Sequence, residues 1–301
     1  MRVGAVDIGT NSTRLLVADV RDADLDEVER LLEITRLGDR VDTDGRLADA
    51  SMDRVHAVLD RYAAQARELD AEHVVATATS AVRDAANGSE FLAEVGRRHG
   101  FETRLLSGRE EAELTYRGVT SRLDAVPGTL VCDIGGGSTE LVLGGPDGVV
   151  DATSLDIGCV RMSERCLHSD PPTAAEVAAL RAAAARLLPE RLTSRAARLV
   201  GVAGTITTLA TIDLGLEREG PELIDGHRLT QATVEALLAR LAALPLAARR
   251  GVRGLMPERA PTIVAGTAIA AEVMRAAGAG EVIVSERDIL HGAALAAADP
   301  G

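Results

Sequence analysis

Two short stretches of the chain repeat the same chemically capable residues in the same order. "DIGTNSTRL" occupies residues 7–15 and "DIGGGSTEL" occupies residues 133–141. In each, an Asp precedes a turn of Gly and hydroxyl residues that lies between two apolar runs. The backbone N–H groups of such a turn form a small concavity that binds phosphate oxygens, and glycine lets the anion come close. An Asp beside the turn can hold a divalent cation, directly or through water.

Two turns of this kind, facing each other over a shared groove, would hold one phosphate chain from both sides, and we predict that arrangement. The predicted donors to phosphate oxygens are Gly9, Asn11, Ser12, Gly135, Gly136, Gly137 and Ser138. A third loop lies in "GVAGTITTLA", where Gly204 and Thr205 fall between a predicted strand and a predicted helix whose dipole attracts anions. A single Gly-rich hairpin is more often a plain turn, but two matching copies favour a binding function.

The carboxylates beside the two turns are the candidate metal ligands. Asp133 and Glu140 lie on the two predicted strands that flank the second turn, so both side chains can reach its tip. Mg²⁺ keeps several waters and takes one or two carboxylates, so we expect this pair to hold Mg²⁺ or Mn²⁺. Asp7, the matching acid of the first copy, is either a second cation contact or a residue that orients its loop. The alternatives without metal binding are a turn cap for Asp133 and an exposed strand position for Glu140.

The elements that must position these residues follow the same plan in both halves of the chain. Three strands are predicted to open each half, at 3–8, 15–20 and 28–37 and again at 130–134, 139–143 and 149–155. Alternating helices and strands come next, which is typical of two α/β domains related by duplication. We place the first domain at 1–120, joined by a C-terminal helix at 288–301, and the second at 121–287.

Composition excludes several classes of function. The chain has 301 residues, 46% of them hydrophobic, and a net charge of −13, so we expect no nucleic-acid partner. All 33 basic residues are Arg, so any charged contact to phosphate must come from a guanidinium group. No apolar run is long enough to span a membrane and no secretory pattern opens the chain. With three scattered Cys residues, we expect a cytoplasmic protein with reduced thiols.

Six stretches, in this order, resemble the Ppx/GppA family, the exopolyphosphatases and guanosine pentaphosphate phosphohydrolases. They are "VDIGTNSTRLLV", "ATATSAVRDAAN", "LLSGREEAELTYRGV", "VCDIGGGSTELVLG", "GVAGTITTLA" and "RAPTIVAGTAIAAEVM". The combination of "SGREEA" with "DIGGGSTE" is the specific part. The resemblance covers essentially the whole chain and is to the short, two-domain type of the family. It implies two similar ribonuclease-H-like (actin-like ATPase) domains flanking a cleft.

The resemblance also implies roles for single residues. Glu111, the second Glu of the E-E-A motif, corresponds to the general base that activates water for attack on the terminal phosphorus. Arg83, in "TSAVRDA", corresponds to the arginine that holds phosphate near the attacked phosphorus. From the residues alone, both positions are equally typical of solvated helix surfaces. Arg14 and Arg109 are weaker candidates for further phosphates.

One stretch departs from the family. Many relatives have Leu-Arg-Glu-Gly before the last helix, where this chain has "DILHG", and the missing Arg and Glu put any role of that stretch in doubt. We expect His291, within it, to be a core or capping residue rather than a ligand.

The leading hypothesis is a metal-dependent exopolyphosphatase that acts on inorganic polyphosphate and prefers short chains. The close competitor is hydrolysis of the 5′ γ-phosphate of guanosine pentaphosphate, a nucleotide of the stringent response. Two further hypotheses are an ATP-dependent kinase of the same superfamily and a non-catalytic sensor of polyphosphate or guanosine tetraphosphate. The sequence leaves a homodimer open.

Overall fold

The computed structural model describes residues 1–21 and 24–299. The chain divides into two compact units: unit 1 comprises Met1–Asp124 with Arg287–Gly301, and unit 2 comprises Ala125–Glu286. Residues 300 and 301, which belong to the predicted C-terminal segment, lie outside the described residues. Within the described residues, no helix is both long and apolar enough to cross a bilayer.

Unit 1 is built on a five-stranded mixed sheet with the order β3-β2-β1-β4-β5. The strands are β1 (Arg2–Ile8), β2 (Thr13–Arg21), β3 (Asp24–Glu33), β4 (His73–Ala78) and β5 (Glu102–Leu105). The first three form an antiparallel meander, and β4 and β5 run parallel to β1. Because β1 is central and buried along nearly its whole length, the Gly turn that follows it starts from a fixed point.

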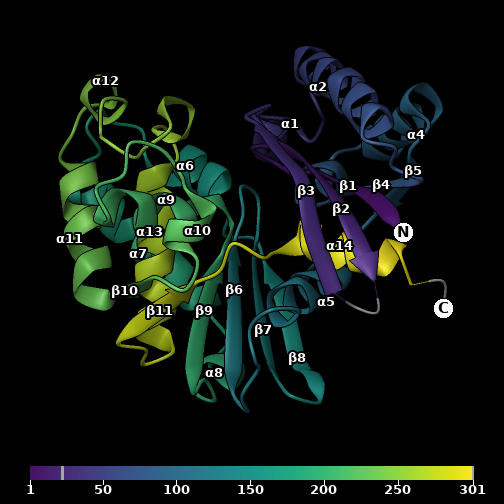
Figure 1. Ribbon diagram of the computed structural model, residues 1–301. Coiled ribbons are helices and arrows are strands. Elements are labelled where there is room, and N and C mark those ends of the chain that lie inside the picture. Colours follow the sequence, from purple (N-terminus) through teal and green to yellow (C-terminus); the bar gives the residue numbers. More distant parts are fainter. Residues whose placement is uncertain (22–23, 300–301) are drawn as a thin grey trace. The chain divides into compact units, whose positions relative to one another are not determined.

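Helices cover both faces of this sheet (Figure 1). On one face, α2 (Asp49–Glu68) and α4 (Gly88–His99) bury Leu59, Tyr62 and Phe91 against strand residues such as Val6. On the other face, α14 (Ile289–Ala297) packs against β1 and β2 and lies beside α5 (Gly108–Thr120). Two short helices, α1 (Val41–Asp44) and α3 (Ser80–Asp84), complete the described part of the unit.

Unit 2 contains a six-stranded mixed sheet with the order β10-β11-β9-β6-β7-β8. The strands are β6 (Thr129–Ile134), β7 (Thr139–Gly145), β8 (Gly148–Leu155), β9 (Arg198–Val202), β10 (Arg228–Thr230) and β11 (Glu281–Val284). Strands β6 to β8 form the meander, and β9 and β11 follow in the places that β4 and β5 take in unit 1, with β10 added at the edge. The predicted α/β class with two similar, ribonuclease-H-like sheets is therefore confirmed.

The helices of unit 2 share one large apolar core with its sheet. They are α6 (Cys159–Cys166), α7 (Ala174–Leu187), α8 (Glu190–Thr193), α9 (Ala203–Asp213), α10 (Pro221–Ile224), α11 (Gln231–Ala242), α12 (Leu246–Arg249) and α13 (Ile263–Ala276), with a 3₁₀ turn at Pro257–Arg259. The Ala-rich helix α13 is buried almost all round, which its small side chains permit. A capping box starts α7, where Thr173 and Glu176 bond reciprocally.

Two local predictions were wrong. The strand predicted at 28–37 ends at Glu33, because residues 35–38 leave the sheet and bond to the first Gly turn instead. No separate Gly turn joins β9 to α9, since the helix begins directly at Ala203, whose φ is 65°.

Candidate active site

The first Gly turn lies at the tip of the β1–β2 hairpin, and its carbonyl groups accept hydrogen bonds from backbone N–H groups of the same unit. Gly9 N closes the turn by donating to Ser12 O at 2.9 Å. The oxygens of Thr10 and Asn11 accept backbone N–H bonds of 2.8–3.1 Å from residues 35–38. Among the described residues, no acceptor binds the N–H groups of Thr10, Asn11 or Ser12. The tip therefore presents several unused backbone donors, as an anion-binding turn requires.

The second Gly turn, at the tip of the β6–β7 hairpin, is organised in the same way. Gly135 N donates to Ser138 O at 3.0 Å, and residues 159–161 of α6 donate N–H bonds to the oxygens of Gly135 and Gly136. The N–H groups of Gly136, Gly137 and Ser138 have no acceptor in the part of the chain that the structure describes. In each unit, the turn that was predicted to bind phosphate thus presents backbone N–H groups without an acceptor among the described residues.

The two hairpins differ in charge although their sequences look alike. In unit 2, Asp133 lies directly opposite Glu140 in the β6–β7 register, and both are buried. Ser154 Oγ donates to Glu140 Oε1 at 2.6 Å. In unit 1, the same register pairs Asp7 with Arg14. One hairpin therefore carries two acids and the other an ion pair.

Arg14 is turned into the protein rather than toward a ligand. Its Nη2 lies 2.7 Å from Asp7 Oδ2, and its Nη1 pairs with Asp288 Oδ2. Burial raises the pKa of Asp7 even though Arg14 opposes the shift. Burial also tends to raise the pKa of Asp288. The attraction of Arg14 outweighs this effect and holds the pKa of that carboxyl well below its usual range. Arg14 is thus a structural cation, and its suggested role as a phosphate ligand finds no support in this geometry.

The carboxylates present fit a hard divalent cation. Asp133 and Glu140 together offer the one or two carboxylates that Mg²⁺ takes from a protein. Asp7 Oδ1 is buried without a hydrogen-bond partner, so a water or a cation could satisfy it. No group of three or more His, Cys, Asp or Glu side chains in the described residues is arranged to hold a metal by itself. A cation here would complete its shell with waters and phosphate oxygens, as Mg²⁺ usually does.

Glu111 and Arg83 are brought together in unit 1. Arg83 Nη1, on α3, donates to Glu111 Oε2 at 3.2 Å and to Leu106 O at 2.8 Å. Glu111 lies in the first turn of α5 but is only 7% exposed, so the interpretation as a solvated helix acid does not apply to it. A buried carboxylate beside a guanidinium group is a suitable pair for proton abstraction next to an anion.

The neighbouring acids Glu110 and Glu113 make local contacts on the helix surface. Glu110 completes a capping box with Ser107, and Glu113 pairs on the surface with Arg109 at 2.8 Å. Both glutamates thus fit the bland interpretation of helix-surface acids. Arg109 is exposed and engaged with Glu113, which gives its suggested phosphate role no support.

An arginine that the sequence analysis did not single out, Arg259, covers the segment of the third predicted loop. The guanidinium group of Arg259 lies directly over Gly204, where an added Cβ would fall 1.8 Å from Arg259 Nη1. Thr205 Oγ1, one residue on, donates to Ile134 O at 3.4 Å, which ties the start of α9 to the end of β6. Arg259 stands in the stretch "RAPTIVAG", but nothing local in the sequence indicated that it would cover a glycine 55 positions earlier.

His291 is the buried cap residue that we predicted. It is fully buried, and its Nδ1 accepts a hydrogen bond from Asp288 N at 3.1 Å in the first turn of α14. Its Nε2 lies 3.0 Å from Glu27 Oε1 on β3. The residue therefore fastens α14 to the sheet of unit 1.

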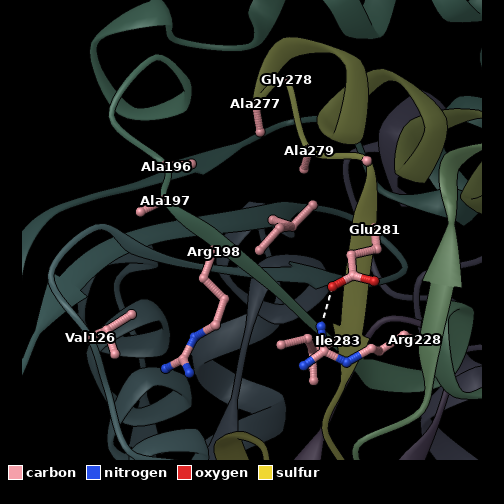
Figure 2. Close-up of a pocket in the computed structure, with 12 residues that line it drawn as sticks. Val126, Ala196, Ala197, Arg198, Arg228, Ala277, Gly278, Ala279, Glu281 and Ile283 are labelled. Carbon is pink, nitrogen blue, oxygen red and sulfur yellow. Dashed lines mark hydrogen bonds and ion pairs between the residues drawn. The ribbon is translucent and has the colours of Figure 1, made fainter.

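A pocket of about 440 Å³ lies in unit 2 at the strand ends opposite the Gly turn (Figure 2). Its two guanidinium groups are already engaged. Arg228 pairs with Glu281, and Arg198 Nη2 donates to Thr129 Oγ1 at 3.2 Å. The rest of the pocket lining is largely Ala and Gly. The pocket therefore does not resemble the turns, whose tips present backbone N–H groups with no acceptor among the described residues.

The chain is similar to known proteins along nearly its whole length. The model of the Ppx/GppA phosphatase family matches residues 16–299. Exopolyphosphatase 2 of Mycobacterium tuberculosis is 39% identical over 319 aligned positions, which cover 99% of this chain and 98% of that protein. The crystal structure of the Aquifex aeolicus Ppx/GppA family member superposes with a TM-score of 0.82 at 31% identity, covering 99% of this chain and 97% of that one.

A guanosine-5′-triphosphate,3′-diphosphate pyrophosphatase of Vibrio cholerae is a partial match. It is 30% identical over 78% of this chain, and the match spans 48% of that protein. The family match and the full-length relative settle the classification: this chain is a homologue of the exopolyphosphatases and belongs to the Ppx/GppA phosphatase family.

Proposed function

We propose that the chain is an exopolyphosphatase that hydrolyses the terminal phosphoanhydride bond of inorganic polyphosphate with Mg²⁺ or Mn²⁺. The observation that carries the proposal is the buried Glu111 carboxylate bonded to Arg83, in a chain that also holds preset N–H donors. The full-length similarity to a mycobacterial exopolyphosphatase supports the choice of substrate.

The proposed mechanism assigns each step to residues of the chain. Attack on a terminal phosphorus needs an in-line water, a proton acceptor and neutralisation of charge on the phosphoryl oxygens. The Glu111 carboxylate takes the proton from water, and Arg83 beside it contacts the transferring phosphoryl group. The turn N–H groups of both hairpins bind phosphate oxygens, as do the N–H groups of Gly204 and Thr205 at the start of α9. Asp133 and Glu140 would hold the cation, which neutralises charge on the phosphates when bound.

Asp7 has a narrower role in this proposal than in the sequence-based prediction. Since Arg14 already occupies its Oδ2, only Oδ1 remains to bind a water or to touch the cation. We propose that Asp7 orients the first turn and contacts the cation at most through that oxygen.

We also propose a preference for short polyphosphate chains. Each Gly turn offers only three backbone N–H groups without a described acceptor, so each can bind only a few phosphate oxygens. The test is phosphate release from polyphosphates of defined length. Rates that rise steeply with chain length would contradict the preference.

Guanosine pentaphosphate is the second candidate substrate, favoured by the partial match to the Vibrio cholerae enzyme. The same base, cation and turns would serve, so a direct comparison is needed. Purified protein with Mg²⁺ should release phosphate from tripolyphosphate at a higher kcat/KM than from guanosine pentaphosphate. The reverse order would favour the nucleotide, transfer to an acceptor would indicate a kinase, and binding without phosphate release would indicate a sensor.

A further inference from the structure

We propose that Arg161, together with Gly158, is a positioning residue that presets the second Gly turn for phosphate. The inference rests on the proposed function of that turn as a phosphate-binding element. Neither residue needs to touch the substrate, because both act through the backbone of Gly135–Ser138.

The planarity of the peptide group links the two sides of the turn. In a trans peptide, the C=O of one residue and the N–H of the next point in opposite directions. Fixing a carbonyl on one side of the turn therefore aims the following N–H to the other side. The three peptide groups at the tip carry the carbonyls of Gly135, Gly136 and Gly137 and the N–H groups of Gly136, Gly137 and Ser138.

All three carbonyls are held from the side of α6. Cys159 N donates to Gly135 O at 2.9 Å, and Val160 N donates to Gly136 O at 2.8 Å. These bonds also satisfy donors at the start of α6, which has no side-chain cap. The three N–H groups consequently point away from α6, and no described residue accepts a bond from them.

Arg161 holds the one peptide group that no backbone donor reaches. Its Nε donates to Gly137 O at 2.7 Å, which aims the N–H of Ser138. Three consecutive glycines would otherwise sample many conformations, including those with the peptide groups reversed. A turn fixed in advance loses less conformational entropy when phosphate binds, and this is the advantage of a preorganised site.

Gly158 allows the approach on which these bonds depend. A Cβ at this position would lie 2.2 Å from Gly136 O, so any side chain would push the turn away from α6. The φ of Gly158 is −96°, which other residues adopt freely. The requirement for glycine here is therefore one of space, which makes Gly158→Ala a clean steric probe.

A pair of substitutions separates the hydrogen bond of Arg161 from its charge. Gln places an amide N–H as many bonds from Cα as the Arg Nε, so Arg161→Gln keeps a donor to Gly137 O but loses the charge. Arg161→Met has a similar length and no donor. We expect Arg161→Met to bind tripolyphosphate about tenfold more weakly than Arg161→Gln, the factor that corresponds to one hydrogen bond.

The experiment is isothermal titration calorimetry of tripolyphosphate with both variants, accompanied by kcat and KM. Gly158→Ala provides an independent second test, with Gly280→Ala as control because no atom lies within 4 Å of a Cβ there. We expect Gly158→Ala to lose up to ~10²-fold in kcat/KM and in affinity, and Gly280→Ala to match wild type. Circular dichroism melts would show that the variants being compared are folded.

The outcomes distinguish this inference from the proposed function. If wild type binds tripolyphosphate but does not hydrolyse it, the proposed function fails and the affinities of the variants still decide the role of Arg161. Equal affinities for Arg161→Gln and Arg161→Met, with a Gly158→Ala affinity like wild type, would overturn the inference even in an active enzyme. A wild-type protein that does not bind tripolyphosphate would overturn both.

Discussion

Arg83 Nη1 lies 3.2 Å from Glu111 Oε2 in unit 1, and the same nitrogen donates to Leu106 O at 2.8 Å. The carbonyl bond anchors the guanidinium group, so the arginine stays beside the carboxylate instead of sampling solvent. In the proposed mechanism, this fixed positive charge lies beside the carboxylate that takes the proton from water and attracts the phosphate oxygens of the substrate. This relationship gives the first prediction.

Replacing Arg83 by Met should lower kcat/KM for tripolyphosphate by about 10²-fold, because one charge-assisted contact to the transferring phosphoryl group is lost. The steady-state kinetics of phosphate release measure this effect. Arg109→Met is the matched control, since Arg109 is exposed and pairs with Glu113 on the surface of α5. Equal losses in the two variants would contradict a specific role for Arg83.

A side chain added at Gly38, which packs against Thr10, should displace the first Gly turn. A Cβ at Gly38 would lie 2.2 Å from the Thr10 methyl group, while the next atoms are 3.2 Å away. Gly38→Ala should therefore displace the tip and weaken tripolyphosphate binding by about tenfold or more. Adding Thr10→Ser removes the methyl group, so the double variant should bind nearly as well as Thr10→Ser alone. A double variant no better than Gly38→Ala would show that the clash is not the cause.

Replacing Arg14 should lower the free energy of unfolding, because Arg14 neutralises buried carboxylates. Arg14→Met would remove the cation that the buried carboxylates of Asp7 and Asp288 share, while Arg30 and His291 stay near Asp288; the expected cost is about 3–5 kcal/mol in the free energy of unfolding. Urea unfolding followed by circular dichroism measures this quantity. Arg40→Met, which breaks the exposed pair with Asp44, should leave the unfolding curve almost unchanged. A small effect of Arg14→Met would mean that the buried network is not needed for the fold.

Acid should destabilise unit 1 through two buried histidines. His56 Nδ1 and His99 Nε2 are 3.0 Å apart between α2 and α4, and burial lowers the pKa of each imidazole below its ordinary 6.5. The charged groups that act on them are Asp53, Asp60, Glu94 and Arg98. The unfolded chain therefore binds more protons than the folded one, and the stability is complete above pH 6.5 and is lost as the pH falls toward the lowered values.

Melting temperatures at a series of pH values between 7.5 and 5 test this pair. The drop in melting temperature on acidification should be smaller in His56→Asn than in wild type, because the variant has one fewer buried group to protonate. The exposed His168→Asn should keep the full wild-type dependence. Identical slopes for wild type and His56→Asn would exclude the histidine pair as the source.

The sequence predicted the positions of the two Gly turns better than the surroundings of the charged side chains. The repeated Asp-Ile-Gly pattern located both turns, because a short Gly-rich segment between two apolar runs is typical of a hairpin turn. It did not show that Arg14 takes the place of Glu140, so that one hairpin is an ion pair and the other an acid pair. That difference depends on Asp288, which lies at the far end of the chain and is brought to Arg14 only by the packing of α14.

Long-range contacts also explain what the sequence could not show at the site. Glu110, Glu111 and Glu113 are indistinguishable as helix acids, and only the packing of α5 makes Glu111 the buried one. The cover of Gly204 by Arg259 joins two segments with no shared motif. The short helix α6 was not predicted because its apolar residues span only about two turns, yet it holds the second turn in place.

The central claim is that Glu111 is the base of a metal-dependent phosphoanhydride hydrolase. The most direct test is the rate of phosphate release from tripolyphosphate in Mg²⁺ by Glu111→Gln, beside wild type and the exposed Glu113→Gln. Glu111→Gln should lose ~10²–10⁴-fold in kcat while still binding the substrate, and Glu113→Gln should remain close to wild type. A Glu111→Gln variant that retains wild-type kcat would contradict this claim.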